Sequence, residues 1–136
     1  MSNIQYINPE GLPKNPAFSH AIITQGSGKT IYIGGQDALN VNGEIVGKGD
    51  LKAQTVQVME NMQTALKACG ATFNDVVKLN IYLLHGQSAH EGYEASKKYL
   101  DTAENPPVIT GTMVAGFAHP DFLVEIDAIA FIPDKK

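Results

Sequence analysis

Two carboxylates near the C-terminal end offer the most direct route to acid–base chemistry. Glu125 and Asp127 stand two residues apart in a run rich in apolar side chains, and in a β-strand this spacing places both on one face. Such a pair is costly to hold unless water or partners satisfy it. Glu125 is the candidate general acid or base, or the group that orients a water. The alternative is an interface carboxylate that is hydrogen-bonded to backbone. We interpret Asp127 as structural and paired with Lys78.

The cationic side chains limit what the chain can bind. All ten basic residues are lysines, and the sequence contains no arginine. A carboxylate ligand is therefore not held here by the two parallel hydrogen bonds that a guanidinium makes. The lysines are scattered and the net charge is -4, whereas nucleic-acid surfaces usually show a basic stripe. We expect no nucleic-acid partner.

The remaining reactive side chains do not form a recognisable centre. His85 and His90 are five residues apart, while His20 and His119 stand in separate segments. No H-E-x-x-H or comparable metal spacing results, so we expect no metal site. A surface or interface role is expected for His20. The single cysteine, Cys69, is expected to be a buried structural residue.

Length and composition are typical of one globular unit. The chain has 136 residues, of which 43% are hydrophobic, and this predicts a single domain over residues 1–136. No stretch approaches the roughly 20 apolar residues of a membrane helix. The first residues lack the basic start and apolar run of a secretion signal. We expect a cytoplasmic protein with no membrane partner.

Two helices should position the candidate residues. Asp50 is the predicted N-cap of the first, and Gly70 is predicted to end it in a left-handed conformation. Apolar residues recur between them at intervals of three and four, which indicates one buried face. That face comprises Thr55, Val58, Met59, Met62, Ala65, Leu66 and Cys69. The second helix is expected from Ser88 to about Leu100, with Glu91 completing a capping box.

Strands are expected at 21–24, 30–33, 76–84, 108–115 and 123–132. The first two are predicted to form a hairpin, and 41–46 a smaller one around an Asn-Gly turn. This order predicts an α+β fold whose largely antiparallel or mixed sheet has both helices on one face. The other face is then either solvated or paired with copies of itself. Its expected side chains are Lys78, Asn80, Tyr82, Glu125, Asp127 and Ile129.

Several short motifs, in order from about Phe18 to Phe131, resemble the YjgF/Rid family, also called endoribonuclease L-PSP. They are Ile33-Gly34-Gly35-Gln36, residues 43–47, Ala53-Gln54-Thr55, residues 75–78 and residues 124–130. The resemblance implies a chorismate-mutase-like (YjgF-like) α+β fold. It also implies a homotrimer whose three sheets form a central barrel, with small-molecule clefts between subunits. Members of the best-studied branch hydrolyse imines and enamines without a metal or cofactor.

The resemblance also implies roles for individual residues. Ile109 occupies the place of the arginine that clamps the substrate carboxylate in that branch. Gly35 matches a glycine whose backbone lines the cleft, and Glu125 matches the glutamate that positions the hydrolytic water. Phe18 stands where a tyrosine is common, and Gly111 where cysteine or another side chain is common. Each of these two changes makes the pocket less polar or roomier.

These residues lead to two hypotheses about function. The first is a Rid-like hydrolase or deaminase that acts on an imine, enamine or related metabolite other than 2-aminoacrylate, because the carboxylate clamp is missing. The second is a non-catalytic trimer that binds a metabolite in the same clefts, or a partner protein. Ribonuclease activity follows only from the family label, and the net negative charge argues against it.

Overall fold

A four-stranded mixed sheet forms the centre of the structure. The computed structural model describes residues 3–134. The strands are, in spatial order, β3 (Gly28–Gln36), β6 (Val124–Pro133), β4 (Val76–Leu84) and β5 (Val108–Val114). β6 runs antiparallel to both neighbours, whereas β5 is parallel to β4. β3 and β5 are therefore the two edges of this sheet.

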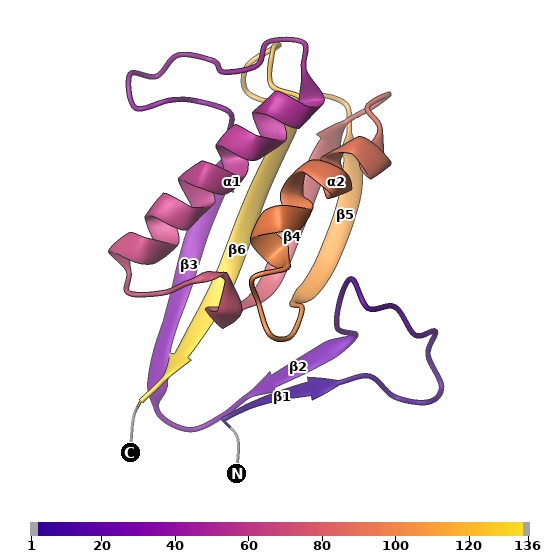
Figure 1. Ribbon diagram of the computed structural model, residues 1–136, viewed down its shortest axis with the longest axis vertical. Helices are drawn as coiled ribbons and strands as arrows, with labels where there is room; N and C mark the ends of the chain where they lie inside the picture. Colours follow the sequence, from indigo (N-terminus) through magenta and orange to yellow (C-terminus); the bar gives the residue numbers. More distant parts are fainter. Residues whose placement is uncertain (1–2, 135–136) are drawn as a thin grey trace.

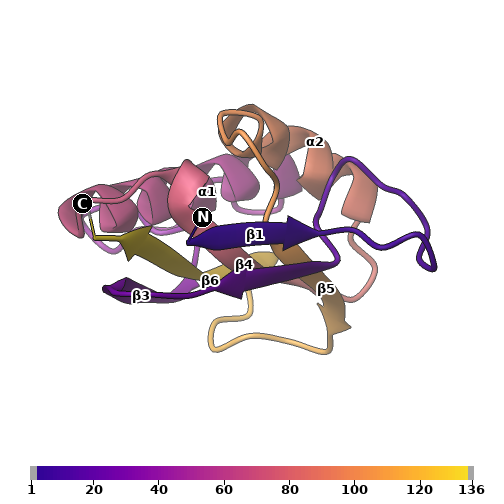
Figure 2. The same ribbon diagram turned by 90° about the horizontal axis from the view of Figure 1, so that it is seen from below.

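Two helices, α1 (Leu51–Ala68) and α2 (Ala89–Leu100), lie side by side over the sheet (Figure 1). Seen from below, both lie on the same side of it (Figure 2). A short 3-10 turn, η1 (Phe73–Asp75), leads into β4. The predicted α+β fold, with a mixed sheet and two helices on one face, is confirmed. Neither helix within residues 3–134 has the length and apolar character that a membrane crossing needs.

The core lies between α1 and the sheet. The buried residues of α1 are Leu51, Gln54, Thr55, Val58, Met59, Met62 and Leu66. α1 packs over β3 and β6, where the small buried side chains of Ala128 and Ala130 allow the helix to approach closely. Burying each large apolar side chain stabilises the fold by about 1.5 to 3 kcal/mol. The 3.6-residue pattern thus indicated the correct face.

The helix ends also follow the local sequence. The Asp50 side chain accepts a hydrogen bond from the backbone N–H of Ala53 at 3.1 Å, and Gly70, which follows the C-cap residue of α1, has a φ of 79°. Ser88 accepts one from the N–H of Glu91 at 3.2 Å. The predicted burial of Cys69 is wrong, because the buried face ends at Leu66 and Cys69 is the exposed C-cap residue.

The strand pairing differs from the predicted hairpins. β2 (Ala21–Thr24) pairs with β1 (Ile4–Ile7), outside the main sheet, whereas β3 pairs with β6. β3 follows β6 closely: a Cβ on Gly28 would lie 2.6 Å from the Phe131 ring. The segment 41–46 is a loop with one bridge, between Leu39 and Ile45. Long-range packing, rather than the nearest turn, determines the partner of β3.

The helix-free face of the sheet carries the polar rows that the alternation predicted. Across β4 and β6, Asn80 stands opposite Asp127 and Tyr82 opposite Glu125. Asn80 Nδ2 donates to Asp127 Oδ1 at 2.7 Å. The predicted pairing of Asp127 with Lys78 is wrong, because Lys78 Nζ donates to Thr110 Oγ1 at 2.7 Å on the neighbouring strand.

Candidate functional site

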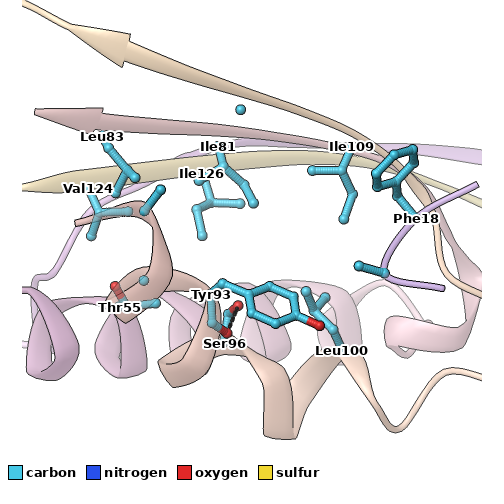
Figure 3. A pocket seen from close by; sticks show the side chains of 14 residues that line it. Phe18, Thr55, Ile81, Leu83, Tyr93, Ser96, Leu100, Ile109, Val124 and Ile126 are labelled. Atoms are coloured by element: carbon cyan, nitrogen blue, oxygen red, sulfur yellow. Dashed lines mark hydrogen bonds between the residues drawn. The ribbon is translucent and has the colours of Figure 1, made fainter. Parts of the chain in front are cut away.

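An apolar pocket of about 190 Å³ lies between α2 and the sheet. Figure 3 shows Ile81, Ile109 and Ile126 projecting from three adjacent strands toward the helix. Tyr93, Ser96 and Leu100 line the opposite wall, on α2. Strand alternation explains the wall that the sheet forms, because residues two apart on one strand face the same side.

The polar groups of the pocket are few and mostly engaged. Thr55 Oγ1 donates to the carbonyl oxygen of Leu51 at 2.8 Å, and Ser96 Oγ donates to that of Tyr93 at 2.9 Å. Among the described residues, none that lines the pocket is charged. The Tyr93 hydroxyl is thus the main polar group that a ligand could meet. The pocket fits an apolar group rather than an anion.

Three of the five predicted site residues line this pocket: Phe18, Ile109 and Gly111. Ile109 and Gly111 lie on the edge strand β5, and a Cβ on Gly111 would meet no atom within 4 Å. Phe18 closes one end of the pocket from the loop that precedes β2 (Figure 3). His20 supports this loop: its Nε2 lies 2.6 Å from the Pro13 carbonyl oxygen, and its ring meets that of Phe18 edge to face.

The other two predicted residues, Gly35 and Glu125, lie together elsewhere. The regular pairing of β3 with β6 is interrupted between Ile33 and Gln36, and this irregularity brings Gly35 against the Glu125 side chain. A Cβ on Gly35 would lie 2.5 Å from Glu125 Oε2, so any other residue there would displace the carboxylate. Within one chain, the pocket and Glu125 are separate.

Asp37, just beyond β3, is a neighbour of Glu125 that the sequence did not single out. Burial raises the pKa of Asp37 from 3.8 to about 7, with a further contribution from the adjacent Glu125 carboxylate. On the same face, the charge of Asp127 raises the pKa of Tyr82. Within residues 3–134 no group of three or more His, Cys, Asp or Glu side chains could hold a metal ion.

Comparison with known proteins places this geometry in a family. The family model described as Endoribonuclease L-PSP matches residues 12–132. The chain belongs to this family. Among YjgF/Rid structures, that of the Rid protein YyfB from Yersinia pestis has a TM-score of 0.85 and 38% identity, and the match covers 96% of this chain and 100% of that one.

Two curated relatives agree with this assignment. A RutC family protein of Pyrococcus horikoshii is 37% identical over 106 residues, which is 77% of this chain and 81% of the relative. The protein named 3-aminoacrylate deaminase RutC of Acinetobacter baylyi is 27% identical over 128 residues, or 94% of this chain and 98% of the relative. The family thus includes a protein named as a deaminase.

Proposed function

We propose that the chain hydrolyses an imine or enamine that presents an apolar group, in clefts between neighbouring copies of a homotrimer. The observation that carries this proposal is the division of the candidate residues: the uncharged pocket reaches the β5 edge, while Gly35 and Glu125 lie toward the β3 side. The family relationship and the name of the Acinetobacter baylyi relative support the type of reaction.

The two sheet edges support assembly into a ring. An exposed edge strand is a ready template for pairing with another chain. Both edges expose large apolar side chains: Tyr32 of β3 is 77% accessible and Met113 of β5 is 47% accessible. If β3 of one copy meets β5 of the next, Glu125 and Gly35 approach the pocket that Ile109 lines. Each cleft then combines residues from two copies.

The lining determines the substrate class. An anion that moves from water to an apolar site without a cationic partner loses hydration that nothing replaces. Ile109 and its neighbours offer no such partner. We therefore assign the pocket to an uncharged, apolar substituent. Imines of acidic or small carboxylate-bearing molecules, including 2-aminoacrylate, fit the site poorly.

Glu125 supplies the acid–base chemistry in this proposal. Its carboxylate takes a proton from a water as the water oxygen bonds to the imine carbon. The C=N electron pair moves to nitrogen, which is protonated by the carboxyl group. The resulting carbinolamine then loses ammonia as its hydroxyl becomes a carbonyl. Such proton transfer contributes about 10²- to 10⁴-fold in rate.

A panel of freshly generated imines tests the proposal. Purified protein should release ammonia from N-unsubstituted imines (C=NH) made by oxidation of apolar amines faster than from those made from acidic amino acids. Glu125→Gln should lower that rate about a hundredfold or more. Binding without turnover would favour the non-catalytic trimer. A stable monomer in sedimentation, with full activity, would contradict the shared cleft.

A further inference from the structure

Two carboxyl groups meet where β3 ends. Gln36 pairs with Ile126, the residue after Glu125, and Asp37 follows directly. Continuing this antiparallel register places Asp37 beside Glu125, and Glu125 is, after burial, a cause of the raised Asp37 pKa. A hydrogen bond between two carboxyl groups requires a proton on one of them, because two carboxylates are both acceptors. Two adjacent carboxyl groups therefore interact favourably when one of them carries a proton.

The Asp37 side chain is incompletely hydrogen-bonded. Its Oδ1 is buried and, among the described residues, has no hydrogen-bonding partner. From α1, the neutral amide of Asn61 faces this region, but its Nδ2 donates to the backbone carbonyl oxygens of Asp37 and Leu39 at 2.9 and 2.8 Å. Glu125 is the charged group that acts on Asp37, and Tyr82 and Asp127 are the next titratable groups on that face.

We propose that Asp37 and Glu125 share one proton and that Asp37 is a positioning residue, which holds this proton for Glu125 during hydrolysis. This inference rests on the proposed function and adds a second carboxyl group to it. Adjacent, partly buried carboxyl groups cannot both ionise easily, so one proton stays on the pair at neutral pH. The rise of the Asp37 pKa to about 7 agrees with this arrangement.

A shared proton balances the reaction without an external acid. The pair begins with one proton; it gives that proton to the imine nitrogen as water attacks, and regains one from the water. In the second step the carbinolamine hydroxyl gives its proton to the pair, while the pair protonates the departing ammonia. Each step leaves the pair as it began. Phe18, which lacks a hydroxyl, cannot supply this proton from the pocket side.

The shared proton can be measured without any substrate. In protein labelled with ¹³C at aspartate and glutamate carboxyl carbons, Asp37→Asn identifies the Asp37 signal by its loss. We expect that signal to titrate near pH 7, and Glu125→Gln to move its midpoint down by about one pH unit or more. The exposed Asp101 gives a matched control, Asp101→Asn, which should leave the midpoint unchanged. A midpoint near 3.8, or one that Glu125→Gln does not move, would overturn the shared proton.

Kinetics test the role of the proton separately. Asp37→Asn keeps a donor toward Glu125 but no transferable proton, so kcat should fall about tenfold or more with KM unchanged, and the pH dependence near 7 should disappear. An unchanged kcat and pH profile would overturn the positioning role. If the wild-type protein turns over no imine while Asp37 still titrates near pH 7, the proposed function fails and the shared proton stands.

Discussion

Ser19 ties the loop that carries Phe18 to the segment before β5: its hydroxyl donates to the Pro106 carbonyl oxygen at 2.6 Å. The Ser19 backbone N–H also donates to the Pro107 carbonyl oxygen at 3.0 Å. Ser19 is 1% accessible, so the two bonds are shielded from water. Residues from distant parts of the sequence are thereby fixed at one end of the pocket.

Replacing Ser19 tests how far this link orders the pocket. Ser19→Ala removes one buried hydrogen bond and leaves the Pro106 carbonyl oxygen without the donor that Ser19 Oγ provides. The free energy of unfolding should fall by about 1 to 2 kcal/mol, as measured by urea denaturation. Because Phe18 becomes more mobile, KM for an apolar imine should rise. Thr64→Ala, at an exposed position of α1, is the control and should change neither quantity strongly.

The contact between Gly35 and Glu125 makes a sharper prediction. Gly35→Ala places a methyl group 2.5 Å from Glu125 Oε2, whereas the same change at Gly34 meets no atom within 4 Å. Gly35→Ala should therefore lower ammonia release about tenfold or more by displacing the carboxylate, and Gly34→Ala should leave it near wild type. Equal activities for the two variants would show that the position of Glu125 does not matter.

The apolar character of the pocket can be reversed at one position. Ile109→Arg introduces a guanidinium into a pocket that has no charge, and a charge-assisted hydrogen bond contributes about 1.5 to 3 kcal/mol. Affinity for a carboxylate-bearing imine analogue should rise about ten- to a hundredfold, as measured by calorimetry. Thr110→Arg places the same group on the opposite face, next to Lys78, and should give no gain. A gain in both variants would indicate a general charge effect.

The Asp37 pKa also predicts how stability depends on pH. Because the pKa of Asp37 rises from 3.8 to about 7 on folding, the folded state binds this proton more tightly than the unfolded state. The associated stability is fully present below about pH 4 and is lost as the pH rises through 7. Asp37→Asn should remove this part of the pH dependence. Its stability relative to that of the wild type should therefore be higher at pH 8 than at pH 5. Urea denaturation of both proteins at pH 5 and pH 8 measures the difference.

Much of the fold follows from local sequence, and the failures have a common origin. Both helices were predictable because Asp50, Gly70 and Ser88 act on neighbouring backbone groups and the apolar period needs no distant partner. The pairing of β3 with β6 was not, because a Gly-rich turn after β2 resembles a hairpin whether or not its strands meet. Cys69 was misplaced for a related reason: the period continues one step beyond the residues that the sheet covers.

The same limit on prediction from local sequence applies to the candidate site. The family motifs identified three residues that line one pocket: Phe18, Ile109 and Gly111. This was possible because the motifs occur along the chain in the same order as the strands. Asp37 escaped notice, because its contact with Glu125 depends on an irregularity in the β3–β6 register that no local pattern reveals. Residues that act through such long-range contacts become visible only once the strands are placed.

The two edges of the sheet have different sequences, and this has a consequence for assembly. A β3 edge that accepts a β5 edge is a head-to-tail contact, and such contacts leave one unsatisfied edge at each end unless the ring closes. The angle between copies then decides between a finite particle and an open fibre. If copies meet through these edges, substitutions at Tyr32 or Met113 would act first on the size distribution of the protein in solution.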